Sequence, residues 1–163
     1  EPAPEALDPL ETLRNLAEDY QTSPLASRIR IEVMPPDEAL KIATDPRLLS
    51  RVLSNMVKNA LEATPEGGTV RLGLKRHGSG AQFWVNNPGF IPRNQQLQVF
   101  QRSFSTKGRN RGLGTYSMKL LAENYLGGRV WFESTPEDGT TFRLWLPPIT
   151  PEKHGPPEPL PEP

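Results

Sequence analysis

The chain has 163 residues, of which 35% are hydrophobic and 23% are charged, so it can bury one ordinary hydrophobic core and is too short for two. Its 19 Lys and Arg residues balance its 19 Asp and Glu residues, which excludes an overall field that draws it to nucleic acid or to an anionic membrane. Cysteine is absent, so disulfides and thiolate metal sites are excluded, and the sequence shows neither a membrane-spanning run nor a signal peptide.

The N-terminal third predicts one helix and two strands. Residues 1–9 are rich in Pro and Glu and are interpreted as a linker before the fold, and the absence of an initiator Met indicates a piece of a longer protein. Residues 10–20 carry an amphipathic helical stripe. Residues 27–34 alternate apolar and polar side chains as a half-buried strand does, and a short strand at 40–43 is expected to pair with them.

Residues 48–63 predict the central helix, with Asp45 as its N-cap and Pro46 as its first residue. Asn55 and Asn59 stack one turn apart, opposite the apolar side. Because Asn costs about half a kcal/mol against Ala in a helix, a merely solvated face would favour Glu, Lys or Gln. On this helix alone, a polar outer face and a binding face both remain open. The core-facing stripe is Leu49, Val52, Leu53, Met56, Val57, Ala60 and Leu61.

The middle of the chain predicts a hairpin of strands at 69–76 and 81–87, joined at 77–80. By strand alternation Asn87 shares the buried face with Val85, while Trp84 and Asn86 point the other way.

The remaining elements complete an α+β pattern. We expect a short helix at 92–101, a loop at 102–111, a helix at 113–126, and strands at 129–134 and 140–146. Residues 148–163 form a tail whose Pro content favours polyproline conformation. Helices on one face of a mixed, mostly antiparallel sheet make a two-layer α/β sandwich, which we assign to residues 10–147.

A cationic, glycine-rich segment precedes the last predicted helix. The glycine pair at 112–114 opens this helix, so free backbone amides and the positive end of the helix dipole are available to an anion. Lys107, Arg109 and Arg111 stand in front of it, and such cations bind phosphate oxygens. The segment is either a polyphosphate site or plain loop geometry.

Four ordered segments resemble the motifs of one family. NMVKNA at 55–60 resembles its N box, FQRSFSTK at 100–107 its F box, RGLGT at 111–115 its second glycine box, and GTTF at 139–142, followed by LWLP, its final strand. The family is that of the ATP-binding catalytic domains of sensor histidine kinases, within the Bergerat-fold superfamily shared with gyrase, heat-shock chaperone and mismatch-repair ATPases.

This resemblance implies ATP and Mg²⁺ as cofactors. Asn59 would ligate Mg²⁺, and Asn55 would support the metal or its waters. Lys107 and Arg111 would clamp the phosphates under a lid at 103–111, and together with Asn59 they are the implied catalytic residues. Thr140 would reach the adenine through water. The implied nucleotide-contacting set is Asn55, Asn59, Asn87, Gly89, Ser105, Thr106, Lys107, Arg111, Gly112, Leu113, Gly114, Thr115 and Thr140.

The first glycine box departs from the family pattern Asp-x-Gly-x-Gly. Here Asn87, Pro88 and Gly89 stand in its place, and the second Gly is absent. An Asn oxygen still accepts from the adenine amino group, but it lacks charge and its own NH₂ needs a partner. Asn86 would take the place of the adenine-reading Asp only if the alignment with the family pattern shifted by one residue. A subset of sensor kinases has the similar sequence Asn-Pro-Gly at this position. This favours the interpretation that the chain belongs to a variant subgroup of the family.

The implied activity is transfer of the ATP γ-phosphoryl group to a His on a separate dimerisation domain. Asn55 stands where the ATPases have a Glu general base, which disfavours water activation. Neither His77, in a hairpin turn, nor His154, in the tail, resembles the acceptor, so both are interpreted as surface residues. The rival hypothesis is a nucleotide-binding regulatory module without phosphoryl transfer.

The implied partners are a phosphoacceptor His domain, from the same chain or a dimer mate, and a response regulator downstream. No contact with nucleic acid or directly with a membrane is expected. We expect the domain to be cytoplasmic, within a protein that can be attached to the inner membrane.

Trp84, Trp131 and Trp145 all fall on the strand phase opposite the core. This predicts an exposed aromatic patch on the outer face of the sheet, and such patches usually meet a partner. Either a Pro-rich terminal segment such as 156–163 or a partner domain covers them, or linker residues bury them in part.

Overall fold

The structure, a computed structural model, describes residues 4–101 and 111–148, and of residues 111–113 it describes the backbone alone. The helices are α1 (Pro9–Gln21), the 3-10 turn η1 (Pro24–Ala26), α2 (Pro46–Glu62), α3 (Arg93–Gln96) and α4 (Arg111–Asn124). The strands are β1 (Glu5–Leu7), β2 (Arg30–Met34), β3 (Ile42–Thr44), β4 (Thr69–His77), β5 (Gly80–Asn87), β6 (Arg129–Thr135) and β7 (Gly139–Leu146).

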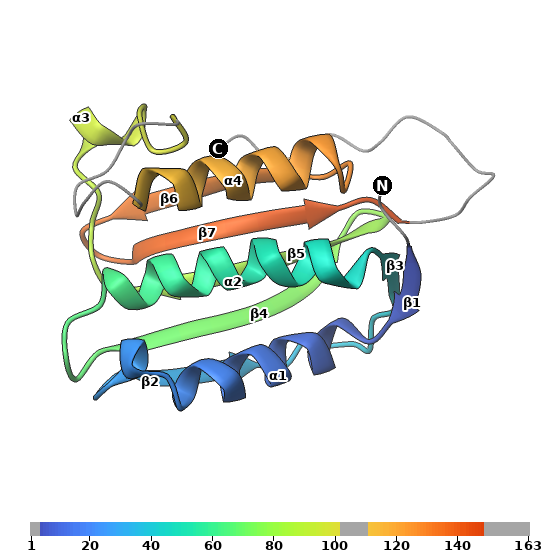
Figure 1. The fold of residues 1–163 in the computed structure, drawn as a ribbon, viewed down its shortest axis with the longest axis horizontal. Helices are drawn as coiled ribbons and strands as arrows, with labels where there is room; N and C mark the ends of the chain where they lie inside the picture. Colours follow the sequence, from blue (N-terminus) through green and yellow to red (C-terminus); the bar gives the residue numbers. More distant parts are fainter. Residues whose placement is uncertain (1–3, 102–110, 149–163) are drawn as a thin grey trace.

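The main sheet has five strands in the order β2-β4-β5-β7-β6. Strand β2 runs parallel to β4, and the other three pairings are antiparallel. Helices α1, α2 and α4 lie side by side on one face of this sheet (Figure 1). The predicted α+β two-layer sandwich is therefore confirmed.

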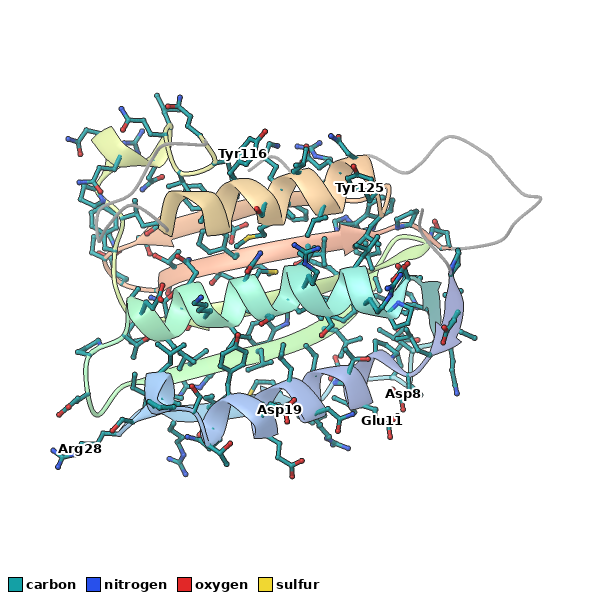
Figure 2. The ribbon with its side chains drawn as sticks, viewed as in Figure 1. Asp8, Glu11, Asp19, Arg28, Tyr116 and Tyr125 are labelled. Carbon is teal, nitrogen blue, oxygen red and sulfur yellow. The ribbon has the colours of Figure 1, made fainter. Side chains whose placement is uncertain are left out.

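Side-chain caps fix where the two first helices begin. The Asp45 carboxylate accepts from the backbone N–H groups of Arg47 (2.9 Å) and Leu48 (3.1 Å), as its predicted N-cap role requires. Asp8 does the same for α1 by accepting from the N–H of Leu10 at 3.0 Å (Figure 2). In α2 the predicted apolar stripe is buried in full.

The core lies between the helices and the inner face of the sheet. Register places Leu72, Val85, Phe142 and Phe132 in one row across β4, β5, β7 and β6. Their burial under α2 and α4 sets the register of the whole sheet, because a slip by one residue would turn every one of these side chains to the other face.

Two predictions about the N-terminal region are wrong. Glu5–Leu7 is not linker but strand β1, and Pro9 already belongs to α1. Strand β3 pairs antiparallel with β1 and not with the strand at 27–34, which pairs with β4. A three-residue strand is too short to show a period, so the sequence held no local signal for this pairing.

Two further boundaries differ, and two predicted segments lie largely outside the described residues. The helix expected at 92–101 is regular only over Arg93–Gln96, and α4 begins at Arg111, two residues before the predicted start. Of the predicted loop at 102–111, residues 102–110 lie outside the described residues and Arg111 belongs to α4, and of the predicted tail at 148–163 only Pro148 is described. None of the described helices combines the length and apolarity needed to cross a bilayer.

The three tryptophans lie on the outer face as predicted, but their expected exposure is wrong for two of them. Trp131 is 2% exposed and Trp145 is 4% exposed, while Trp84 is half-buried. The His77 side chain, interpreted as a surface residue, makes two contacts. Its ring nitrogen Nδ1 lies 2.9 Å from Gln82 Nε2, and its ring packs edge-on against Trp145.

Candidate functional site

The central helix and the last helix share one cavity of about 380 Å³. Asn55 lines it from α2, and Gly114 and Ser117 line it from α4. No heavy atom of the described residues lies within 4 Å of the place where a Gly114 Cβ would stand. The two segments that the sequence singled out, far apart in the chain, therefore face the same open space.

Helices α2 and α4 run in opposite directions along the sheet. Ala63, just after α2, lies near Gly89 at the end of β5, whereas Gly128, just after α4, lies near Trp145 at the other end of β7. Asn59, one turn after Asn55, is thus level with the first turn of α4. The free N–H groups and positive dipole end of the α4 start lie on the same side as this part of α2.

Asn55 and Asn59 are both half-buried. Among the described residues, neither side chain has a hydrogen-bond partner. Because these side chains are partly open to solvent and make no bond within the described part of the protein, their amide groups are available to a polar ligand. The binding-face interpretation of this helix stays a prediction.

Asn87 is 2% exposed at the end of β5, on the face covered by the helices. Its Nδ2 donates to the backbone oxygen of Pro88 at 2.6 Å. This bond supplies the partner that an Asn NH₂ needs and leaves Oδ1 as an acceptor. Gly89 then turns the chain with a φ of +122°, a conformation that side chains rarely adopt.

A short polar network ties this turn to the last two strands. The Thr140 hydroxyl, 3% exposed, donates to the Gly89 oxygen at 2.8 Å and accepts from Ser134 Oγ at 2.7 Å. Ser134 Oγ in turn accepts from the Ile91 N–H at 2.8 Å. Ser134 was not predicted as a site residue. It stands two residues after Phe132 on β6 and therefore on the same inner face, and this alternation is the sequence signal that could have identified it.

The segment before the predicted lid is fixed to the core and to α4. Thr115, in the first turn of α4, is 6% exposed and its hydroxyl donates to the Val99 oxygen at 2.7 Å. The Phe100 ring packs edge-on against Phe132 and Phe142, at centroid distances of 5.7 and 5.9 Å. Val99 and the first turn of α4 are thereby held together.

The remaining predicted residues are placed only in part. Arg111, Gly112 and Leu113 form the start of α4, and nothing further is described of their side chains. Ser105, Thr106 and Lys107 lie outside the described residues. Tyr116 points to the side of α4 away from α2 (Figure 2), as expected two residues after Gly114 in a helix.

Comparison with known proteins gives one consistent result. Residues 44–150 match the family described as histidine kinase-, DNA gyrase B-, and HSP90-like ATPase. The circadian input-output histidine kinase CikA of Synechococcus elongatus is 37% identical over 110 residues, which are 63% of this chain and 14% of CikA. The chain spans 14% to 35% of the length of the first curated relatives that it matches.

Solved structures extend the likeness to nearly the whole chain. The nucleotide-free catalytic domain of histidine kinase ThkA has a TM-score of 0.80 and 26% identity, covering 90% of this chain and 96% of that domain. Full-length ShkA in complex with AMPPNP has a TM-score of 0.79 and 26% identity, covering 92% of this chain and 32% of ShkA.

Proposed function

We propose that this chain, which belongs to the histidine kinase-, DNA gyrase B-, and HSP90-like ATPase family, binds Mg-ATP in its site and transfers the γ-phosphoryl group to a histidine. The observation that carries the proposal is the cavity shared by Asn55 and Gly114, which brings the side-chain amide of α2 and the first turn of α4 together. ShkA, of similar fold, was solved with AMPPNP.

The phosphate end of the site fits a magnesium polyphosphate. Mg²⁺ prefers oxygen ligands and keeps several waters and phosphate oxygens, so one amide oxygen, that of Asn59, is a sufficient protein contribution. When bound, the ion would neutralise charge on the transferring phosphoryl group. Asn55, one turn earlier, would orient water at the same place, and the amides of Gly112 and Gly114 would face the phosphates.

The base end of the site fits adenine. Asn87 Oδ1 is left as an acceptor by the bond from Nδ2 to Pro88, and an acceptor suits the exocyclic amino group of adenine. The Thr140 hydroxyl proton is committed to Gly89, so Thr140 would reach the base only by accepting from a bridging water.

The chemical step requires an acceptor nitrogen from outside this domain. The bond from the γ-phosphorus to the bridging oxygen would break, ADP would leave, and a bond would form to an imidazole nitrogen. Asn55 stands where the related ATPases have a Glu general base, and an amide has no useful basicity, so Asn55 would not activate water. Lys107 and Arg111 would balance the phosphate charge.

The acceptor domain and a response regulator are the partners we propose. The chain spans at most 35% of the first relatives, so the acceptor histidine would lie on another part of the protein or on a dimer mate. Because ATP is a cytoplasmic substrate, we place this domain in the cytoplasm of a protein that can be attached to the inner membrane.

The first test is the variant Asn59→Ala, with the exposed neighbour Lys58→Ala as the matched control. We expect Mg-ATP affinity, measured by calorimetry on the 163-residue chain, to fall at least about tenfold in Asn59→Ala, since a contact to a charged group is lost. Lys58→Ala should bind normally. Unchanged affinity in a folded Asn59→Ala variant would contradict the site assignment.

A second experiment separates the kinase from the regulatory module. The chain is incubated with γ-labelled ATP and its cognate acceptor domain, and the protein-bound label is tested for the acid lability of phosphohistidine. Label on histidine supports the kinase. Nucleotide binding without any transfer supports the regulatory module instead.

A further inference from the structure

The sheet face that carries no helix has its own layer of large side chains. Register places Trp84, Arg143 and Trp131 in one row across β5, β7 and β6, and Trp145 in the next row beside Gln82. We call the surface formed by Trp84, Trp131, Trp145, Arg143 and Gln82 the tryptophan face. Helices α1, α2 and α4 all lie on the opposite side of the sheet (Figure 1).

Two of these indoles are buried, and while Trp145 lies against Gly80 and His77, the burial of Trp131 needs a covering layer. Trp131 is 2% exposed and Trp145 is 4% exposed, yet neither belongs to the hydrophobic core under the helices. Trp131 also lies on β6, which is an edge strand of the sheet. An indole at the edge of an uncovered sheet face is open to water, so the burial of Trp131 points to an additional segment over it.

The indole N–H groups indicate what that segment offers. Trp145 Nε1–H donates to the His77 oxygen at 3.2 Å. Trp131 Nε1–H is buried and has no acceptor among the described residues. Because a buried indole N–H normally finds a partner, the covering segment should present a free carbonyl oxygen.

We propose that the Pro-rich segment at 156–163 of this same chain lies across the tryptophan face and accepts the Trp131 Nε1–H bond. A polyproline helix makes no internal hydrogen bonds, so its carbonyls are free, and aromatic surfaces are its usual docking sites. Glu158 and Glu162 of the segment would face the exposed Lys75 and Arg129, which continue the row of Trp145.

The chain is long enough to make this return. The described part ends at Pro148, two residues after β7, and 15 residues follow. In polyproline conformation the seven residues 149–155 span about 22 Å. Trp131 pairs with Arg143, which lies three residues before the end of β7. Trp131 on the neighbouring strand is therefore roughly 11 Å from the end of β7.

The test is hydrogen exchange of the three indole N–H groups by NMR in the 163-residue chain, assigned with single Trp→Phe variants. Pro156, Pro157, Pro159 and Pro161 are replaced together by Ser. The matched control replaces Thr150, Lys153 and His154 by Ser and keeps every proline. Trp145 Nε1–H, bonded to His77, serves as the internal reference for the fold.

We expect Trp131 Nε1–H exchange to accelerate at least about tenfold in the proline variant and to stay unchanged in the control. A synthetic peptide of residues 149–163, added to the proline variant, should restore slow exchange. Equal Trp131 protection in the proline variant and the unaltered chain would overturn the proposal. Protection that rises with protein concentration would also overturn it, because a second copy would then be the covering layer.

Discussion

Two adjacent asparagines show how strand alternation divides roles between neighbouring residues. Asn86 points to the outer face, where its Nδ2 donates to Thr141 Oγ1 at 2.9 Å and to the Asp138 oxygen at 3.1 Å, which fixes the β6–β7 turn. Asn87 points inward, and its Nδ2 donates to Pro88. In the variant glycine box the Asn87 NH₂ group is therefore bonded to the backbone, and its Oδ1 is left as an acceptor.

Replacing Asn87 by Ala tests the base-reading role. We expect ATP affinity to fall about tenfold while the weaker GTP binding changes little, since the lost acceptor matches the adenine amino group. Competition against a fluorescent nucleotide measures both. Asn86→Ala is the matched control, with lower stability and unaltered ATP affinity; equal loss for ATP and GTP in Asn87→Ala would argue against adenine reading.

At the scale of elements, the site depends on how closely three chain segments approach one another. The turn after β5 packs against the end of α2, and Gly139, which opens β7 with a φ of +76°, lies against the backbone oxygen of Asn87. Any side chain at Gly139 would be built into that oxygen. The glycine at this position is thus required by the contact as well as by its backbone angle.

A pair of glycine variants separates these two requirements. Gly67 also has a positive φ, +89°, but no described heavy atom lies within 4 Å of its Cβ position. We expect Gly67→Ala to lose about 1 kcal/mol of unfolding free energy from backbone strain, and Gly139→Ala to lose at least about 3 kcal/mol because strain and overlap add. Urea unfolding of both variants gives the comparison. Equal losses would show that the contact with Asn87 does not matter.

At the scale of the whole molecule, the site is a junction between the helix layer and the sheet. The turn at 87–91 contacts the end of α2 through Gly89 and Ala63, and it is tied to β6 and β7 by the Ser134–Thr140 pair. Further along α2, Asn55 shares a cavity with the first turn of α4. A ligand bound there would connect both layers, so its binding free energy adds to the stability of the folded state.

Mg-ATP should accordingly raise the melting temperature. At a free concentration of 100 times Kd the stabilisation is about 2.7 kcal/mol, which for a domain of this size is about 5–10 °C. Differential scanning fluorimetry measures the shift, and Asn59→Ala at the same concentration should show a much smaller one. A full shift in that variant would place the nucleotide elsewhere.

Signals carried by neighbouring residues were enough to predict most of the elements. The apolar period of α2, its Asp45 cap, the alternation of β4 to β7 and the glycine-rich start of α4 are all local properties of the sequence, and they sufficed for the fold class and for the amide and glycine motifs. The alternation of β5 also assigned Asn87 to the inner face and Asn86 to the outer face, in agreement with the register between β5 and β7.

Contacts between residues far apart in the chain follow from the tertiary structure alone. The pairing of β1 with β3, the partner of Asn87, the place of Ser134, the closeness of Gly139 to Asn87 and the burial of Trp131 all depend on which segments meet. Periodicity reports which face a side chain takes, but it carries no information on what lies opposite that face, and here this decides both the site and the tryptophan face.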